Sequence, residues 1–319
     1  MRIAIFGATS QIAKDLVLSF TLKSRNELVL YARRPDVVRS WLCDIGQQDR
    51  IPANSFSEFS VLEKFDAIIN FVGIGDPARA VAAGADIFEA TFQYDDLAIN
   101  YQKKHTDCRY IFLSSGAAYG TTFDEPVDAK TTTCFAINNL QPTDWYAVAK
   151  LHAECRHRSL PQLSIFDIRI FNYFSHTQDM QARFLTTDIL RAIATDTTLQ
   201  TTSDNIFRDY IHPADFYLLV ATLLDCPKAN LPVDCYSLAP ISKNDLLAAM
   251  QERFNLKYET TTSQVSINAT GLKKNYYSLN KRAGDFGYNP TFTSMAGILL
   301  EFEKALAQLS FCSKPTQLY

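Results

Sequence analysis

The chain has 319 residues, enough to bury one large core or two smaller ones. A hydrophobic content of 47% and a net charge of −3 give no reason to expect nucleic acid or an anionic membrane as a partner. No apolar run approaches the ~18 residues that span a bilayer. The seven cysteines show no paired spacing and no signal-like segment opens the sequence, so we expect reduced thiols and a cytoplasmic protein.

The first element predicts a nucleotide-binding turn. An apolar strand at 3–6 is followed by Gly7, and an amphipathic helix begins near Gln11. Backbone N–H groups and the helix dipole at such a turn bind a pyrophosphate. Two positions that are usually glycine hold the small residues Ser10 and Ala13, and the Ser10 hydroxyl can reach a phosphate. The expected cofactor-binding residues of this turn are Gly7, Thr9, Ser10, Gln11 and Ile12.

The end of the second predicted strand, at 27–31, indicates which cofactor binds. Proteins that hold NAD usually place an acid there, on the ribose 2′-hydroxyl. This chain has no acid in that window, and Arg33 and Arg34 follow. Because guanidinium groups pair well with a 2′-phosphate, we expect NADP, with NAD as the less favoured cofactor. The alternative is that both arginines belong to a solvated basic turn.

Apolar runs and helical patterns alternate through the first half of the chain. Near-continuous apolar runs with helices between them are typical of a parallel sheet covered on both faces. We therefore predict an α/β fold with a Rossmann-type doubly wound parallel sheet. The runs span 67–72, 109–114 and 163–171, and the helices span 87–104 and 146–158.

The alternation loosens after Phe171. Polar loops are predicted at 196–203 and 260–266. Apolar residues recur at helical spacing between Met295 and Leu309 and predict a last helix. There is no internal repeat and no obvious linker.

Tyr146 and Lys150 lie four residues apart and therefore share one face of a predicted helix. A tyrosine with its ordinary pKa near 10 does not exchange protons easily at neutral pH, and a cationic lysine beside it lowers that pKa. A serine hydroxyl from a strand end can hydrogen-bond the same substrate oxygen. Together these groups can move a proton on or off a carbonyl oxygen while a nicotinamide moves the hydride. The alternative is a helix with a surface lysine and a half-buried tyrosine.

A metal site is the other chemistry to weigh. His152, Cys155 and His157 follow Lys150 closely. On a helix 152 and 155 share a face while 157 points elsewhere, and no clustered carboxylates complete a site. We expect these to be ordinary helix positions and expect no metal.

The motifs, taken in chain order, resemble those of the extended short-chain dehydrogenases/reductases of the NAD-dependent epimerase/dehydratase family, most of which act on nucleotide-sugars. The resemblance covers nearly the whole chain. The two replaced glycines and a long loop before Tyr146 depart from the family pattern. The matching segments are 7–13, 114–120, 146–150, 169–172, 207–212 and 286–290.

The resemblance implies a role for each catalytic residue. Tyr146 donates a proton to the substrate carbonyl oxygen. Lys150 lowers the pKa of Tyr146 and hydrogen-bonds the nicotinamide ribose, so both residues also bind the cofactor. Ser115 helps to polarise the carbonyl. Its neighbour Ser114 could be confused with it and is expected at the substrate, although strand alternation lets only one of the two face the cleft.

The resemblance also implies a substrate site in the C-terminal half. Asn172 and Arg208 match positions that bind the nucleotide diphosphate. The alternative for Asn172 is an ordinary turn residue, and the alternative for Arg208 is a salt bridge with an acid. Phe184 is expected to line the base pocket, although a single aromatic is more often a core residue. Residues 1–171 are expected to form the dinucleotide-binding domain. Residues 172–319 are expected to form a smaller, mainly substrate-binding α/β region, with some segments returning to the Rossmann sheet.

The expected reaction is NADP(H)-dependent reduction of a keto group on a nucleotide-linked sugar, of the 4-ketoreductase type. The family's 4,6-dehydratases carry an Asp-Glu pair after the active-site hydroxyl residue, whereas this chain has Gly116 and Ala117. One alternative is a nucleotide-sugar epimerase with tightly bound NAD(P), and another is a non-enzymatic NADP(H)-binding regulator. In the resembling family the helices that correspond to 87–104 and 146–158 often form a dimer, so we expect a homodimer.

Overall fold

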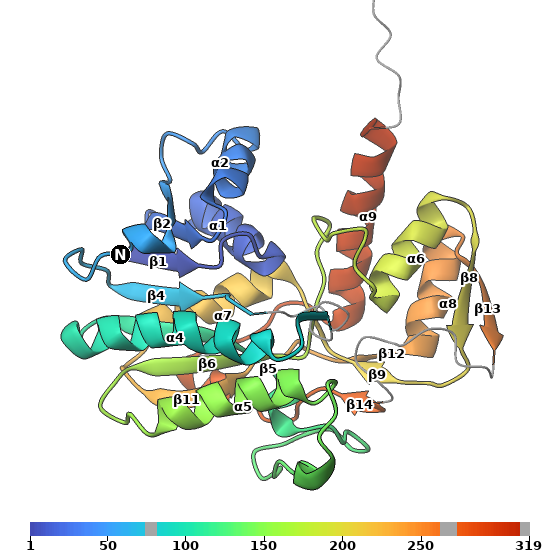
Figure 1. The fold of residues 1–319 in the computed structure, drawn as a ribbon. Helices are drawn as coiled ribbons and strands as arrows, with labels where there is room; N and C mark the ends of the chain where they lie inside the picture. Colours follow the sequence, from blue (N-terminus) through green and yellow to red (C-terminus); the bar gives the residue numbers. More distant parts are fainter. Residues whose placement is uncertain (74–81, 262–272, 313–319) are drawn as a thin grey trace, which may run out of the picture.

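A seven-stranded parallel sheet organises the protein. The computed structural model describes residues 1–73, 82–261 and 273–312. The strand order β11-β6-β5-β4-β1-β2-β3 runs outwards in both directions from the β1–β4 pair, as in a doubly wound sheet (Figure 1). The predicted α/β fold is therefore confirmed. The strands are β1 Arg2–Phe6, β2 Glu27–Ala32, β3 Ala53–Ser55, β4 Ala67–Asn70, β5 Arg109–Ser115, β6 Ile165–Ile170 and β11 Asn230–Asp234.

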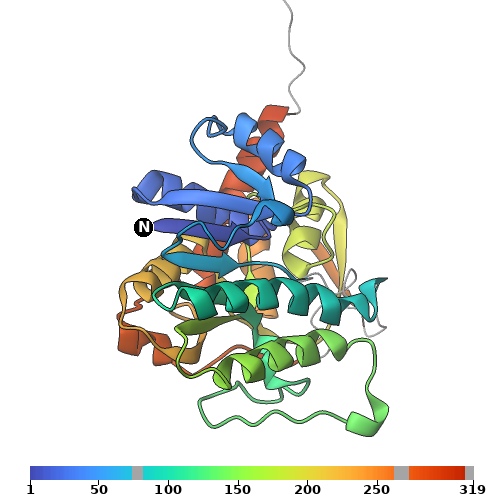
Figure 2. The ribbon, with the colours of Figure 1, turned by 60° about the vertical axis from the view of Figure 1, so that its left-hand side comes forward.

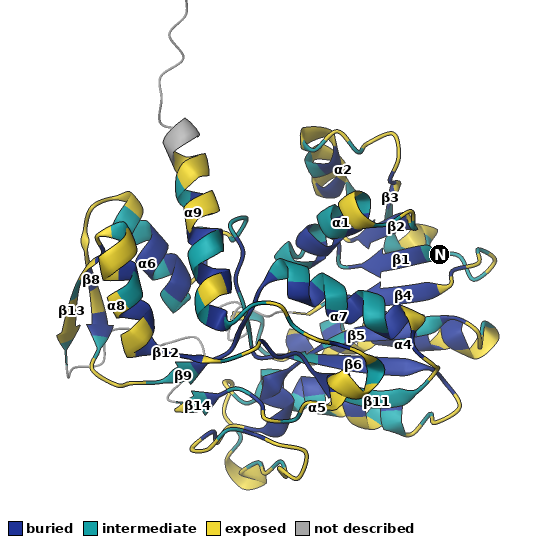
Figure 3. Ribbon diagram, turned by 180° about the vertical axis from the view of Figure 1, so that it is seen from behind, coloured by how far each residue is buried: buried dark blue, intermediate teal, exposed yellow. Residues whose placement is uncertain are grey.

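Helices cover both faces of this sheet. Alternate strand residues point to opposite sides, so Ile3 and Ile5 of β1 pack under α1, α2 and α7, while Ala4 and Phe6 belong to the core under α4 and α5. The strands are buried along most of their length (Figure 3). Helices α4 and α5 contact each other and lie side by side (Figure 2). The helices are α1 Gln11–Lys23, α2 Pro35–Asp44, α4 Asp86–Lys104, α5 Trp145–Arg158 and α7 Pro213–Asp225.

After β6 the chain alternates between the sheet and a smaller region. Strand β11 returns to the sheet beside β6, and α7 packs beside α1. The smaller region has its own core, in which Ile189, Met250 and Phe302 are fully buried, and α9 stands between it and the sheet (Figure 1). The boundary at residue 171 stays a prediction. The elements are β7 Asn172–Tyr173, α6 Leu185–Ala194, β8 Thr198–Thr202, β9 Phe207–Arg208, β10 Tyr210–Ile211, β12 Ile241–Ser242, α8 Lys243–Phe254, β13 Lys257–Thr261, β14 Asn275–Tyr276 and α9 Ser294–Cys312.

The polar loop predicted at 196–203 is wrong. Most of that segment is β8, which pairs in parallel with β13. Threonine is polar, but its branched β-carbon suits an extended strand, and the partner strand is distant in the sequence. The second predicted loop, 260–266, begins inside β13, and its residues 262–266 lie outside the described residues. Across the described part of the chain, no helix is both long enough and apolar enough to cross a membrane.

Candidate active site

The turn between β1 and α1 requires a glycine. Gly7 has a φ of +76°, in the left-handed region that favours glycine. Its N–H donates to the Tyr31 carbonyl at 2.9 Å, which holds the turn against the end of β2. A β-carbon at Gly7 would lie 2.9 Å from the backbone carbon of Phe71 and from the backbone nitrogen of Val72. The turn therefore packs tightly on the segment that follows β4, at the point where the strand order reverses.

The N-terminus of α1 presents polar groups beside this turn. Ser10 is the N-cap of α1, and its side chain makes no capping hydrogen bond. Thr9 is exposed, and Ile12 is half-buried. The Gln11 amide instead donates to Asp15 at 3.2 Å and to Thr177. The Ser10 hydroxyl and the helix N-terminus are thus placed to receive a phosphate, while the Gln11 side chain ties α1 to the chain after β7.

Arg33 and Arg34 follow β2 directly, and both are exposed. The β1–α1 turn lies beside them because Gly7 and Ala8 both donate to the Tyr31 carbonyl. Within the described ranges of the chain, neither arginine forms an ion pair. Both arginines are therefore exposed next to the β1–α1 turn, and no acid stands at the end of β2.

Ser115 and Tyr146 come together at one end of the sheet. Ser115 is the last residue of β5, and Tyr146 is in the first turn of α5. The Ser115 Oγ accepts a hydrogen bond from the Ala117 N–H at 3.1 Å. Burial raises the pKa of the half-buried Tyr146, and a hydrogen bond with Ser115 opposes that rise. The serine is therefore the group that favours the phenolate.

Lys150 lies one helical turn after Tyr146 and is buried. Its Nζ donates to the Leu113 carbonyl at 2.7 Å and lies 5.9 Å from the centroid of the Tyr146 ring. Burial lowers the pKa of Lys150 to about 8, although Asp95 and other nearby carboxylates oppose the shift. The sequence predicts that Lys150 lowers the pKa of Tyr146, but its ammonium donates to a β5 carbonyl. The hydrogen bond from Ser115 supplies the lowering contribution.

The structure does not bring Ser114 into this cluster. Its Oγ donates to Glu154 at 2.5 Å, and Glu154 also pairs with Arg169 at 2.5 Å. Ser114 and Glu154 are both buried. Burial raises the pKa of Glu154, and the Arg169 guanidinium opposes that rise. Adjacent residues on a strand face opposite ways, so Ser114 helps to hold α5 against the sheet while Ser115 faces Tyr146.

Arg208 lies at the centre of a small three-stranded sheet. Strand β9 pairs with β12 on one side and β14 on the other, and Arg208 is 4% exposed. Its Nη1 donates to the Phe207 and Lys273 carbonyls at 2.8 and 2.7 Å. Burial lowers the pKa of Arg208. Asn172, on β7, is half-buried and makes a 3.5 Å contact from Nδ2 to the Asp209 carbonyl.

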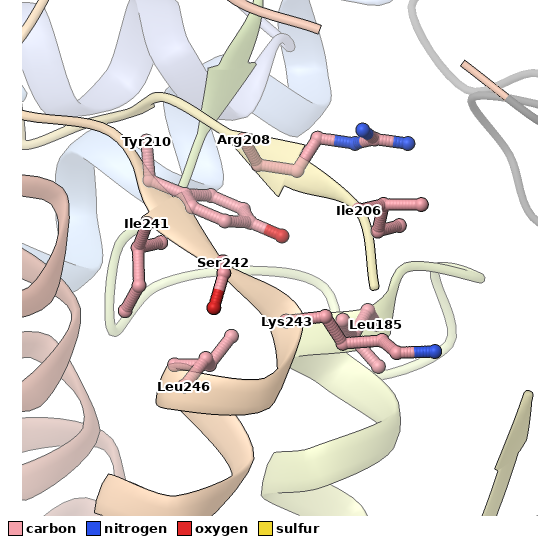
Figure 4. A pocket seen from close by; sticks show the side chains of 8 residues that line it. All are labelled: Leu185, Ile206, Arg208, Tyr210, Ile241, Ser242, Lys243 and Leu246. Carbon is pink, nitrogen blue, oxygen red and sulfur yellow. The ribbon is translucent and has the colours of Figure 1, made fainter. Parts of the chain in front are cut away.

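A small cavity opens beside Arg208 (Figure 4). Its free space is about 10 Å³, room for about one water and far below the ~300 Å³ of a typical ligand pocket, so the cavity by itself cannot hold a substrate. Phe184 is half-buried and is not among the residues that line it, but the next residue, Leu185, is. The lining includes apolar Leu185, Ile206 and Leu246, together with Arg208, Tyr210 and Lys243.

Sequence reasoning missed Tyr276 and Lys273. The Tyr276 hydroxyl lies 3.3 Å from the Ser115 Oγ, and the Lys273 Nζ lies 4.6 Å from the centroid of the Tyr276 ring. Burial lowers the pKa of Lys273 to about 8. Tyr276 reaches the site through β14, which pairs with Arg208 in register. A two-residue strand has no periodic pattern, so the sequence carries no signal for either residue.

The residues weighed as metal ligands have other partners. His157 is buried between two carboxylates, with Nδ1 2.6 Å from Asp167 and Nε2 2.7 Å from Asp95. His152 and Cys155 are exposed on the same helix. In the regions that the structure describes, no three side chains of the metal-ligating types form a cluster.

Comparison with solved structures shows the same fold. UDP-glucuronic acid 4-epimerase from Bacillus cereus, in a variant bound to UDP-4-deoxy-4-fluoro-glucuronic acid and NAD, is 17% identical with a TM-score of 0.77, covering 97% of this chain and 100% of that one. UDP-glucose 4-epimerase from Bifidobacterium longum, bound to NAD⁺ and UDP, is 16% identical with a TM-score of 0.73, covering 97% and 98%. UDP-N-acetylglucosamine 4-epimerase from Methanobrevibacter ruminantium M1, bound to UDP-N-acetylmuramic acid, is 13% identical with a TM-score of 0.77, covering 98% and 99%. At these identities the likeness shows the fold alone.

A sequence search of curated proteins finds no match. The family profile described as NAD dependent epimerase/dehydratase matches residues 3–239, which include the cofactor turn, Ser115, Tyr146, Lys150 and Arg208. The resemblance that the motifs predict is therefore confirmed: the chain belongs to the NAD-dependent epimerase/dehydratase family of extended short-chain dehydrogenase/reductase enzymes.

Proposed function

We propose that the protein is a nucleotide-sugar 4-epimerase that keeps its nicotinamide cofactor bound through the reaction. The observation that carries this proposal is that Ser115, Tyr146 and Lys150 lie at one end of the sheet. The two residues after Ser115, Gly116 and Ala117, are neither acids nor bases. Two of the similar structures are 4-epimerases with bound NAD, which favours epimerisation over net reduction.

The residues present fit a dinucleotide. The Gly7 turn has no room for a β-carbon, the Ser10 hydroxyl caps nothing, and the α1 N-terminus faces the same place. The Gly7 turn and the N-terminus of α1 would hold the dinucleotide, and a bound nicotinamide would supply reversible hydride exchange with C4 of the sugar. Tyr146 as phenolate takes the proton of the 4-hydroxyl and later gives it back to the carbonyl oxygen. Ser115 donates a hydrogen bond to that oxygen and keeps it within reach of Tyr146.

Burial fixes the position of Lys150 but disfavours its charge, which the nearby carboxylates of Asp95 and Glu154 support. With its pKa lowered to about 8, the ammonium still dominates at neutral pH. Its Nζ would lie 3.1 Å from a β-carbon at Gly73, so the bare glycine leaves an opening beside it. We propose that a ribose hydroxyl of the cofactor binds Lys150 through this opening.

Dehydration is disfavoured by the identity of Gly116 and Ala117, which carry no acid or base, and also by the packing around them. A β-carbon at Gly116 would lie 2.4 Å from the Phe171 ring, and Ala117 is buried. An acid at either position would have to displace the residues behind it. The 4,6-dehydratase mechanism, which needs an acid and a base there, therefore has no place in this site.

Reduction of a 4-keto sugar by NADPH is the second candidate. It is favoured by Arg33 and Arg34, which stand exposed beside the β1–α1 turn, and by the lack of an acid at the end of β2. A cofactor that carries a 2′-phosphate suits a reductase that exchanges its cofactor. A regulator without catalysis is the third reading, and the intact Ser115, Tyr146 and Lys150 argue against it.

We propose that the nucleotide diphosphate binds along Arg208 and Lys273. Both cations border the Tyr276 ring next to Ser115, so a diphosphate there would put an attached sugar at the catalytic residues. Asn172 is proposed as a further diphosphate contact at the end of β7. We propose that the base lies beside Phe184 and Leu185, next to the small cavity and not inside it, because the cavity has room for only about one water.

We also propose a homodimer through α4 and α5. Phe88 and Phe92 on α4 are 36% and 42% exposed, and the Arg156 guanidinium of α5 covers the Phe92 ring at 4.6 Å. Two copies related by a two-fold axis would bury these rings as part of a four-helix contact. Sedimentation at micromolar concentration should give a dimer, and Phe92→Asp should give a monomer. A cytoplasmic location, expected from the cysteine pattern, stays a prediction.

The experiment is a substrate panel followed by NMR. Purified protein is incubated with UDP-glucose, UDP-glucuronic acid or UDP-N-acetylglucosamine and catalytic amounts of NAD⁺ or NADP⁺. We expect at least one sugar to reach equilibrium with its C4 epimer, with no net change in absorbance at 340 nm. Tyr146→Phe is the matched control and should form the epimer about 10²–10⁴-fold more slowly. Stoichiometric oxidation of NADPH with a 4-keto sugar, and no epimer from any of the three, would move the enzyme to the reductase class.

A further inference from the structure

A second phenol lies against the catalytic serine. The Tyr276 hydroxyl is 3.3 Å from the Ser115 Oγ, and Tyr276 is 4% exposed. Its ring is fixed edge-on between Phe123 at 4.8 Å and Phe171 at 5.2 Å. On its faces lie the cations Arg208, 5.8 Å from the ring centroid, and Lys273, 4.6 Å away. Tyr276 therefore connects the proposed diphosphate site with the catalytic centre.

The hydrogen-bond inventory decides which hydroxyl donates. A serine hydroxyl has one hydrogen and two acceptor positions. The Ala117 N–H occupies one acceptor position of Ser115. A Tyr146 phenolate, the form that takes a proton, can only accept, so it draws the single hydrogen of Ser115. The remaining acceptor position of Ser115 faces Tyr276, whose hydroxyl must then be the donor.

We propose, on the basis of the proposed epimerase reaction, that Tyr276 is a positioning residue that donates to Ser115 and fixes the direction of the single Ser115 hydrogen, which points to the Tyr146 phenolate before the substrate binds and to the substrate oxygen afterwards. With both acceptor positions filled, the Ser115 hydroxyl cannot rotate away from the reacting oxygen. The chain from Tyr276 through Ser115 to Tyr146 also polarises each hydrogen bond in turn, which strengthens the last one. Tyr276 acts through Ser115 and does not itself exchange a proton with the substrate.

The test is Tyr276→Phe, which removes one hydroxyl and leaves the ring in its aromatic and cationic contacts. It is assayed by C4 epimerisation of whichever sugar of the UDP panel the unmodified protein converts. We expect kcat to fall about 3- to 10-fold, the worth of one neutral hydrogen bond, with KM unchanged. In a Ser115→Ala background, Tyr276→Phe should lower kcat no further, because the Ser115 hydroxyl that Tyr276 orients is absent.

Tyr288→Phe is the matched control. Tyr288 is equally buried, and its hydroxyl donates to the Tyr236 carbonyl at 2.8 Å, away from the site. It should lower the midpoint of thermal unfolding without changing kcat. The positioning role is refuted if Tyr276→Phe, like Tyr288→Phe, lowers the midpoint of thermal unfolding and leaves kcat unchanged. It is also refuted if the fold-loss of kcat caused by Tyr276→Phe is the same with and without Ser115→Ala. If Ser115→Ala and Tyr146→Phe are themselves fully active, the proposed function fails instead, so the two failures are distinct.

Discussion

His157 gives the most quantitative prediction. It lies on α5, the helix that carries Tyr146, and it is fully buried. Its two ring nitrogens face carboxylate oxygens of Asp167 and Asp95 at 2.6 and 2.7 Å. An ionised carboxylate only accepts hydrogen bonds, so both nitrogens must carry hydrogen and the ring is a cation. Burial alone would lower the pKa of His157, but the two aspartates outweigh it and raise the pKa to about 9.

The raised pKa makes stability depend on pH with a definite sign. In the unfolded chain the pKa of His157 returns to about 6.5. The stabilisation is therefore complete below about pH 6.5 and is lost as the pH rises through about 9. Linkage gives a loss of about 1.5 kcal/mol in the free energy of unfolding between about pH 6.5 and about pH 8. Lys150 and Lys273, whose pKa values burial lowers to about 8, are half titrated at the upper end of this window and offset part of the loss, by about 0.4 kcal/mol each.

The assay is urea unfolding at the two ends of that window. The unmodified protein and His152→Gln, an exposed substitution on the same helix, should show the loss, whereas His157→Gln should be less stable and should lose no stability as the pH rises across the window. If His157→Gln does not fold, the titration of the His157 ring by NMR in the unmodified protein decides. A free energy of unfolding that does not change across the window, or a ring that titrates near its ordinary pKa, would refute the cationic assignment.

Four further variants test the site. Arg33→Ala with Arg34→Ala should remove a preference for NADPH over NADH of about 1–3 kcal/mol in fluorescence titrations; equal affinities in the unmodified protein would count against the 2′-phosphate site. Tyr146→Phe should cost about 10²–10⁴-fold in rate with cofactor binding retained, and near-normal turnover would exclude Tyr146 as the proton carrier. Lys150→Ala should lower both rate and cofactor affinity, whereas an effect on rate alone would remove its ribose contact. Gly7→Ala should weaken cofactor binding and cost about 1–3 kcal/mol of stability, measured by calorimetry, because its β-carbon meets backbone; an unchanged unfolding midpoint would contradict the tight turn.

The sequence predicts those elements of the protein that are determined by residues adjacent in the chain. The strand, turn and helix around Gly7 follow one another directly, and the apolar runs that become β4, β5 and β6 are continuous, so their pattern indicates a covered parallel sheet. The alternation of a strand separates Ser114 from Ser115, and the structure gives the two hydroxyls different partners. These features depend on neighbours in the chain.

What the sequence cannot predict depends on distant partners. Strand β8 is polar, and it becomes a strand because β13 pairs with it. Tyr276 enters the site only because β14 pairs with β9, which carries Arg208. Lys150 has the helical spacing to reach Tyr146, yet the Leu113 carbonyl competes for its Nζ. In each case a tertiary contact decides between two roles that the residue type allows.

The central claim is that hydride leaves C4 of the sugar and returns to the same carbon. The most direct measurement uses UDP-glucose and UDP-glucuronic acid deuterated at C4, with catalytic cofactor, and follows the product by NMR and mass spectrometry. The proposed reaction predicts a C4 epimer of at least one of these sugars that retains the deuterium at C4. An epimer that has lost the label to solvent, or no epimer while reduced cofactor is consumed by a 4-keto sugar, would contradict it.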